Sequence, residues 1–486
     1  MWKPPEKIKC LPDPGVWPSV EEVASSRLFS PLKHGNLELL QRTWIPAMVP
    51  WRATEEGEVT DAVVEWYERF ARGRPGAIVV EATGIRDVPS GPLLRIGHDR
   101  YIEGLKRIVE AVKHASGGET KLYIQIIDFL SIRRRPARDK FLGRFLRITD
   151  AHRAALGAED WSEQTVREAL MVLENEELYK ILDPREQEDL ERGHRERVTD
   201  TELPHIRDLP EVLPELFANA ARRAKEAGFD GVELHYAHAY TMASFLSKLN
   251  TRDDGYGGSP EARVRLPLEV YDACRQAVGD DYVLGCRMLS EDCIDGGSTL
   301  EDTTFYAKRF AEAGMDFLSF SRGGKFEDAL QPRVGDAIYP YTGPSGYECM
   351  PQFISDVKGP YGRNVEPTAH IRQSLREAGL NTPVVVAGGI HGFHQAEDIL
   401  AADKADVIGL ARQAMADPDW FLKVKTGAGA AVNVCKYTNY CEGLDQKHKV
   451  VTCQLWDREA LDEPGISKTD DGKRRLTAPL WKREEA

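Results

Sequence analysis

Eight short apolar runs rich in β-branched residues recur along this chain, and most are followed by a longer amphipathic stretch. The runs are residues 44–49, 77–82, 121–127, 231–235, 283–288, 317–321, 384–387 and 406–411. Such alternation is typical of βα units around a parallel sheet, and eight units predict an α/β protein with a TIM (β/α)8 barrel. The competing doubly wound open sheet is disfavoured, because no early strand is followed by GxGxxG.

The predicted barrel, residues 28–426, is interrupted twice. Residues 131–210 are rich in charge and helix formers, with residues 159–182 as the clearest helix, and they form a long helical insertion after the third strand. Because loops after barrel strands surround the active-site mouth, we expect a cap over the substrate; an oligomer contact or a solvated hairpin is the alternative. A second excursion, residues 325–365, follows the sixth strand. Residues 1–27 and 427–486 are predicted extensions, and residues 454–486 are polar enough to be partly disordered.

Composition limits the partners that the chain can have. The net charge of −14 comes from 64 basic and 78 acidic residues spread along the chain, which argues against non-specific nucleic-acid binding. No apolar run approaches the roughly 20 residues that span a bilayer, and the opening MWKPPEKIKC shows no leader pattern. We therefore expect a cytoplasmic protein with no membrane partner.

Small residues follow the last two predicted strands, where barrels commonly build a phosphate site. These are Gly388-Gly389 after the seventh strand and Ala411-Arg412 after the eighth. Backbone N–H groups can approach a phosphate there, and a guanidinium can pair with it. Glycines also close tight βα turns, but this position favours a phosphate ligand.

The fourth strand ends in HYAHAY, so His235, His238 and Tyr240 are expected together at the mouth. A structural histidine is the ordinary alternative for any one of them, but three polar rings at one strand end favour catalysis. Two imidazole N–H groups can stabilise an oxyanion, and a phenol can supply a proton. A zinc pair is the other functional interpretation, yet no carboxylate or cysteine lies convincingly beside the motif.

Several segments closely resemble the old yellow enzyme family of FMN oxidoreductases. They are RLFSPLKHGNLELLQR (27–42), VVEATGI (79–85), GFDGVELHYAHAYTMASFLSKLNTRDDGYGGSPEAR (228–263), VVVAGGI (384–390) and DVIGLARQAMADP (406–418). The resemblance covers about residues 27–425 apart from the two excursions, and the stretch from His235 through GYGGSPEAR is its most specific part. It implies FMN as the cofactor of the barrel and NADH or NADPH as the reductant.

The resemblance also implies a role for each matching position. The flavin would be held by Pro46, Ala47, Met48, Val49, Ala82, Gln125, Arg287, Gly388, Gly389, Ala411 and Arg412. His235 and His238 would hold the oxygen of the substrate, and Tyr240 would protonate its α-carbon. The implied reaction is that of an ene-reductase: hydride passes through FMN to the β-carbon of an α,β-unsaturated carbonyl or enoyl-CoA-like small molecule.

Some positions depart from the family pattern. Val49 cannot make the hydrogen bond to the flavin that threonine or cysteine makes in many members. Asp128 and Phe129 replace groups that often line the mouth, and Trp51 is expected near the substrate, although it could wedge against the insertion.

The tail NVCKYTNYCEGLDQKHKVVTC resembles the [4Fe-4S] segment of the 2,4-dienoyl-CoA reductase and trimethylamine dehydrogenase branch. Cys435, Cys441 and Cys453 are the candidate ligands, but Cys435 is out of register and the second cysteine is replaced by Tyr437 or Thr438. We therefore predict the relic of a lost cluster and no metal site. The additional nucleotide-binding domains of that branch are not expected here, so electrons would come from a nicotinamide or an electron-donor protein.

Two other functions remain open at this point. One is an amine dehydrogenase or demethylase of the related branch, and the other is a flavin-binding protein that has lost turnover. The long insertion favours a bulky substrate for an ene-reductase, and a homo-oligomer is compatible with the sequence.

Overall fold

The computed structural model describes residues 8–10, 12–351 and 353–482. Eight parallel strands close into a barrel in the order β11-β12-β4-β5-β6-β7-β8-β9, which confirms the predicted TIM barrel. Each predicted run supplies one strand: β4 (Thr43–Ile45), β5 (Ala77–Gly84), β6 (Lys121–Ile127), β7 (Gly231–Tyr236), β8 (Val283–Leu289), β9 (Leu318–Ser321), β11 (Val384–Ala387) and β12 (Val407–Gly409). The first strand is shorter than predicted, so residues 46–49 form a loop at its carboxyl end.

The inside of the barrel is filled by large rings at its amino-terminal end. Trp44 stacks on Tyr123 and meets Phe317 edge-on, with ring centroids 5.1 Å apart in both pairs. The hairpin of β2 (Leu32–His34) and β3 (Leu37–Leu39) closes this end with the buried Leu37 and Leu39. Because this end is plugged, the open end is the one at which the strands finish.

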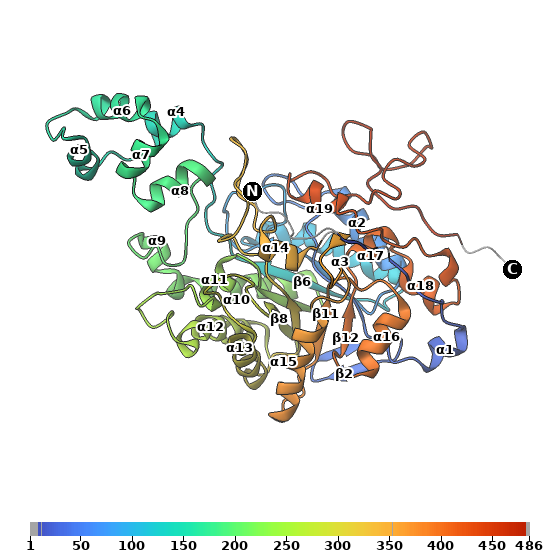
Figure 1. Cartoon of the computed structure of the whole chain (residues 1–486). Helices are drawn as coiled ribbons and strands as arrows, with labels where there is room; N and C mark the ends of the chain where they lie inside the picture. The colour runs from blue at the N-terminus through green and yellow to red at the C-terminus, as the bar shows by residue number, and fades with distance from the viewer. Residues whose placement is uncertain (1–7, 11, 352, 483–486) are drawn as a thin grey trace.

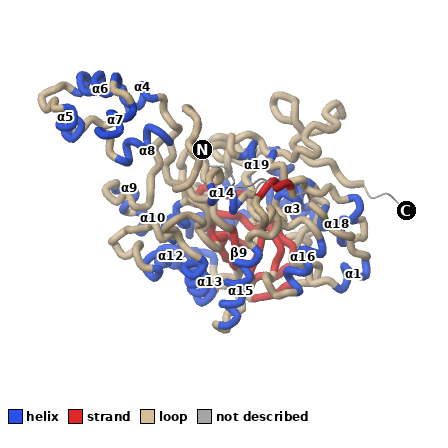
Figure 2. The backbone as a smooth tube through the Cα atoms, in the orientation of Figure 1, coloured by secondary structure: helices blue, strands red, loops and turns tan. Residues whose placement is uncertain are grey.

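Helices pack around the strands, as Figures 1 and 2 show. The outer ring contains α2 (Asp61–Arg72), α3 (Ile102–Ser116), α10 (Leu209–Ala227), α12 (Pro260–Val278), α13 (Leu300–Ala313), α15 (Val365–Glu377), α16 (Phe393–Ala401), α17 (Arg412–Ala416) and α18 (Trp420–Lys425). One face of α3 is buried at Ile102, Leu105, Ile108 and Val112. Shorter elements are α1 (Val20–Ser25), η1 (Asp99–Tyr101), α11 (Thr241–Leu246), α14 (Pro344–Cys349), η3 (Gly429–Ala431) and α19 (Tyr440–Asp445). In the described part of the chain, no helix combines the length and apolar character needed to cross a membrane.

The insertion after β6 forms a separate helical lobe, the green region in the upper left of Figure 1. It consists of α4 (Arg138–Lys140), η2 (Phe141–Phe145), α5 (Asp150–Leu156), α6 (Glu163–Val172), α7 (Asn175–Ile181) and α8 (Pro184–Arg192), and α9 (Pro204–Arg207) leads back to the barrel. The lobe has its own core, which includes Phe141, Leu170 and Leu178. The single helix predicted over residues 159–182 is wrong: the chain turns between α6 and α7, so that Leu170 and Leu178 reach the same core.

Both extensions pack on the barrel. The strand β1 (Ile8–Lys9) pairs with β10 (Ile354–Ser355) of the second excursion. Residues 454–482, which were expected to be partly disordered, instead contain the buried Trp456. They also supply carbonyl oxygens to two buried arginines: Arg52, which precedes α2, and Arg69, which lies on α2. Those guanidinium groups need acceptors, and the backbone of the polar tail provides them. Residues 1–7 and 483–486 of the predicted extensions lie outside the described residues.

Candidate active site

A cavity of about 1320 Å³ lies at the carboxyl ends of the barrel strands. Its wall contains sixteen of the predicted site residues: Pro46, Ala47, Met48, Val49, Trp51, Ala82, Gln125, Phe129, His235, His238, Tyr240, Arg287, Gly388, Gly389, Ala411 and Arg412. From the long insertion it takes only Ile132 and Arg134 among the described residues. The expected cap is therefore limited to the base of the insertion, because the helices of the lobe pack on their own core.

Asp128 does not line this cavity, contrary to the prediction. Its carboxylate is buried and accepts hydrogen bonds from Nε of Arg86 at 2.5 Å and Nη2 at 2.9 Å. Neighbouring side chains of an extended segment point to opposite sides, so Phe129 faces the cavity while Asp128 faces away. Burial raises the pKa of Asp128, and the pairing with Arg86 opposes that rise.

Gln125 lies in the cavity wall and forms a polar pair with the buried Glu233 behind it. Gln125 donates a hydrogen bond from Nε2 to Oε1 of Glu233 at 2.6 Å. Burial raises the pKa of Glu233 to about 7, and the charge of Arg287 acts in the opposite direction. Nη1 of Arg287 is buried without a hydrogen-bond partner, as is Oε2 of Glu233. A buried guanidinium nitrogen without a partner needs an acceptor, and a bound cofactor with ring oxygens would supply one.

The opposite side of the cavity has the features of a phosphate grip. Gly389 has φ +66°, and a Cβ there would lie 2.1 Å from the carbonyl oxygen of Pro360, so only glycine fits. Arg412 lies with its guanidinium carbon 4.6 Å from the ring centre of Tyr437 and donates to Oδ1 of Asn439 at 2.6 Å. The C-terminal extension therefore fixes the arginine that the sequence assigned to phosphate.

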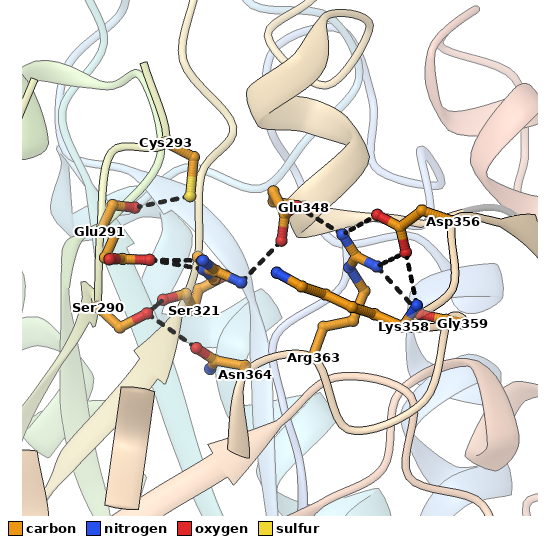
Figure 3. A network of polar contacts seen from close by, with 11 residues as sticks. Ser290, Glu291, Cys293, Ser321, Glu348, Asp356, Lys358, Gly359, Arg363 and Asn364 are labelled. Carbon is orange, nitrogen blue, oxygen red and sulfur yellow. Dashed lines mark hydrogen bonds and ion pairs between the residues drawn. The ribbon is translucent and has the colours of Figure 1, made fainter. Parts of the chain in front are cut away.

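A network of ion pairs stabilises the second excursion, residues 325–365, beside this site (Figure 3). Arg363 pairs with Glu348 of α14 at 2.5 Å and with Asp356 at 2.9 Å. Arg322, which follows β9, joins Glu348 to Glu291 beyond β8. These contacts hold the loop between β9 and α15 against the barrel, and that loop forms part of the cavity wall.

Both histidines at the end of β7 are neutral hydrogen-bonding groups. Burial lowers the pKa of His235 to about 3 and lowers that of His238 well below its usual range. Nδ1 of His235 accepts from the backbone N–H of Ala237 at 3.2 Å, which leaves the proton on Nε2. Nε2 of His238 contacts Oγ of Ser321 at 2.9 Å, while its Nδ1 has no partner. The two ring centres are 5.3 Å apart, so the pair can approach one ligand oxygen.

Tyr240 completes the predicted set. Its ring centre lies 5.5 Å from that of His235. Burial, helped by the nearby Asp445, raises the pKa of Tyr240 above its ordinary value. The phenol is therefore protonated at neutral pH and can act as a proton donor.

The sequence reasoning missed a group of residues at the mouth, contributed by the second excursion and the C-terminal extension. Nε1 of Trp51 donates to Oδ1 of Asp445 at 2.6 Å, and the indole stacks on His448 at 4.0 Å. Tyr339 donates to the other oxygen of Asp445. Trp51, with φ 55°, thus packs against the C-terminal extension and not against the long insertion. The tyrosines of the second excursion could have indicated this group from the sequence, whereas no sequence pattern around Asp445 predicts its position at the mouth.

The three tail cysteines border one small hollow beside Arg412. Neither residue at the position of the second cluster cysteine is placed to bind iron. The Tyr437 ring is buried under Arg412, and the Thr438 hydroxyl donates a hydrogen bond to Gln454 at 2.6 Å. The described residues contain no group of three or more His, Cys, Asp or Glu that could hold a metal ion. These residues do not fit a four-cysteine cluster, and its loss remains a prediction for iron analysis.

Comparison with known proteins gives consistent matches. The model of the NADH:flavin oxidoreductase / NADH oxidase family matches residues 27–129 and 184–430. NADH oxidase from Thermoanaerobacter brockii is 30% identical over 413 residues, which are 84% of this chain and 52% of that protein. NADPH dehydrogenase from Geobacillus sp. (strain WCH70) is 30% identical over 397 residues, 81% of this chain and 92% of that protein. This chain spans about half the length of the first of these relatives.

A solved structure of 2-naphthoyl-CoA reductase with 2-naphthoyl-CoA superposes with a TM-score of 0.63 and 20% identity. The superposition covers 91% of this chain and 59% of that one, and it shows a shared fold.

Proposed function

The chain belongs to the NADH:flavin oxidoreductase / NADH oxidase family, which includes the old yellow enzymes, and on that premise we propose that it is an FMN-dependent ene-reductase. Its substrate would be an α,β-unsaturated carbonyl compound or a related enoyl-CoA, and NADH or NADPH would be the reductant. The observation that carries the proposal is the set of neutral His235, neutral His238 and protonated Tyr240 at the end of one strand, in the cavity that also contains Arg287 and Gln125.

The residues in the cavity fit FMN. Arg287 offers an unpartnered guanidinium nitrogen to an electron-rich ring edge, and Gln125 is oriented by Glu233. Gly389, with a φ of +66° that favours glycine, lies in the cavity wall where its backbone could face a phosphate, and Arg412 would pair with the phosphate charge. When bound, FMN supplies hydride transfer, which no amino-acid side chain can perform.

The protein would contribute orientation and proton transfer. A carbonyl oxygen placed between His235 and His238 would accept hydrogen bonds from the N–H groups of two imidazole rings. Both rings are neutral, because burial disfavours the charged form. Polarisation of the carbonyl draws electron density from the β-carbon, which then accepts hydride. Tyr240 donates its phenolic proton to the α-carbon, so an O–H bond breaks as a C–H bond forms.

Half-reaction kinetics of Tyr240→Phe test this proposal. We expect flavin reduction by NADH or NADPH to keep its wild-type rate, because the phenol takes no part in it. We expect reoxidation by enones to slow roughly 10²- to 10⁴-fold, the usual contribution of a general acid. Equal reoxidation rates in the variant and the wild type would contradict the proposed role. A substrate panel from cyclohexenone to enoyl-CoA compounds then tests whether the substrate is bulky.

An amine dehydrogenase or demethylase is the second candidate, and two carboxyl groups in the cavity wall favour it. Asp445 and Glu442 lie on α19, and burial raises their pKa values to about 6 and about 7. With the rings of Trp51 and Tyr339 nearby, they could attract a cation. Flavin reduction by methylated amines with release of aldehyde would support this candidate. Flavin reduction by NAD(P)H without reoxidation by any acceptor would instead indicate a protein that has lost turnover.

A further inference from the structure

His238 makes a side-chain contact that the mechanism above does not use. Nε2 of its ring lies 2.9 Å from Oγ of Ser321, the last residue of β9, and both residues line the cavity. Nδ1, the other ring nitrogen, is buried and has no hydrogen-bond partner among the described residues. A hydrogen bond at one imidazole nitrogen determines which nitrogen carries the proton. The tautomer of His238 therefore depends on whether the Ser321 hydroxyl donates or accepts.

The backbone holds these two side chains against each other. His238 has a φ of 63°, a left-handed conformation that is uncommon for residues other than glycine. The carbonyl oxygen of Ser321 accepts hydrogen bonds from the N–H of Ser290 at 2.8 Å and from its hydroxyl at 3.2 Å (Figure 3). A Cβ on Gly324 would lie 3.2 Å from Cδ2 of His238, so the imidazole packs on the chain that follows Ser321. An unusual backbone conformation at a candidate site points to a functional constraint.

The surroundings of the Ser321 hydroxyl favour donation to His238. Oγ of Ser321 also contacts Sγ of Cys349, at 3.8 Å. Sulfur is a weak acceptor, so the hydroxyl hydrogen is better accepted by the imidazole nitrogen at 2.9 Å. Burial raises the pKa of Cys349, so the thiol keeps its hydrogen and can direct it to Oγ of Ser321. Nε2 of His238 is then the acceptor, and the ring proton lies on Nδ1.

We propose that Ser321 is a positioning residue that fixes His238 in the Nδ1–H tautomer, so that this N–H donates to the oxygen of the substrate. The inference rests on the proposed ene-reductase function. The opposite tautomer would present a lone pair on Nδ1, which cannot donate to a carbonyl oxygen. His235 already offers its Nε2–H, since its Nδ1 accepts from the backbone, and its ring centre lies 5.3 Å from that of His238. Ser321 thus acts through His238 by supplying the second donor of the pair.

The tautomer of His238 can be measured by NMR in the resting holoenzyme. In protein isotope-labelled at the histidine ring nitrogens, the couplings to ring hydrogens distinguish a protonated nitrogen from a bare one. The signals of His238 are identified by their loss in His238→Gln. We expect the wild type to carry the proton on Nδ1. In Ser321→Ala we expect unchanged FMN content but the appearance of the Nε2–H form, because Nε2 no longer accepts a hydrogen bond.

Ligand binding gives a second readout that needs no turnover. Cyclohexenone should bind the oxidised Ser321→Ala holoenzyme about tenfold more weakly than the wild type, because one hydrogen bond to its oxygen is lost. Perturbation of the flavin absorbance measures this affinity. Ser319→Ala is the matched control, since Ser319 lies on the same strand and its buried hydroxyl has no hydrogen-bond partner among the described residues. This control should change neither the tautomer nor the affinity.

The outcomes separate this inference from the proposed function. A wild-type His238 with its proton on Nε2 overturns the inference, and so does Ser321→Ala if its tautomer or its affinity for cyclohexenone is that of the wild type. Neither result changes the test of the proposed function, the reoxidation kinetics of Tyr240→Phe. If Tyr240→Phe reoxidises at the wild-type rate, the proposed function fails and this inference fails with it. A changed tautomer and weaker binding in Ser321→Ala, but not in Ser319→Ala, support the inference.

Discussion

Glu81 is a carboxyl group buried between β5 and α2, next to the residue Ala82 of the cavity wall. Tyr67 of α2 donates to its Oε2 at 2.9 Å, and burial raises its pKa from 4.5 to about 8. Between these values the folded protein keeps the proton while the unfolded chain loses it. Stability therefore falls as pH rises through this window, by about 1.4 kcal/mol per pH unit and about 5 kcal/mol in all.

Glu81→Gln removes this dependence, because an amide resembles the protonated carboxyl and does not titrate. Urea unfolding should give similar free energies of unfolding for variant and wild type near the acid end of the window. The variant should become progressively more stable than the wild type up to about pH 8, with a difference of several kcal/mol. Glu110→Gln, on the exposed face of α3, removes the same charge in solvent and should stay parallel to the wild type. A pH-independent difference between Glu81→Gln and wild type would refute the reasoning.

Three further changes test other parts of the molecule. Gly389→Ala should weaken FMN binding about tenfold or more, measured by fluorescence titration, because its Cβ meets the carbonyl of Pro360 and its φ is unfavourable for alanine. Leu170→Ala should destabilise the helical lobe by about 3 kcal/mol, visible as faster amide exchange in the lobe alone, while flavin reduction is unchanged. Cys441→Ser should leave the absorption spectrum unchanged; stoichiometric iron in the wild type that is lost in this variant would show that a cluster survives.

Much of the barrel and of its floor could be predicted because the relevant signals are local. Apolar runs of strand length identify strands, and residues at the end of a parallel strand must lie at the same end of the barrel as those of its neighbours. Gln125, Arg287 and Gly389 therefore lie in one cavity although they are distant in sequence. The pattern of residues along the strand could not place Asp128. Whether its carboxylate faces the cavity or Arg86 depends on the path that the chain takes after β6.

By itself, the sequence determined the eight strands, the residues at their ends and the family resemblance that assigns them to a flavin. Only the tertiary structure decided which residues meet at the mouth of the cavity. Trp51 and Tyr339 both donate hydrogen bonds to the carboxylate of Asp445, although they lie 394 and 106 positions from it in the sequence. Likewise, the insertion looked like a cap in sequence but folds on its own core. Such contacts depend on packing between distant segments, which no local pattern of residues records.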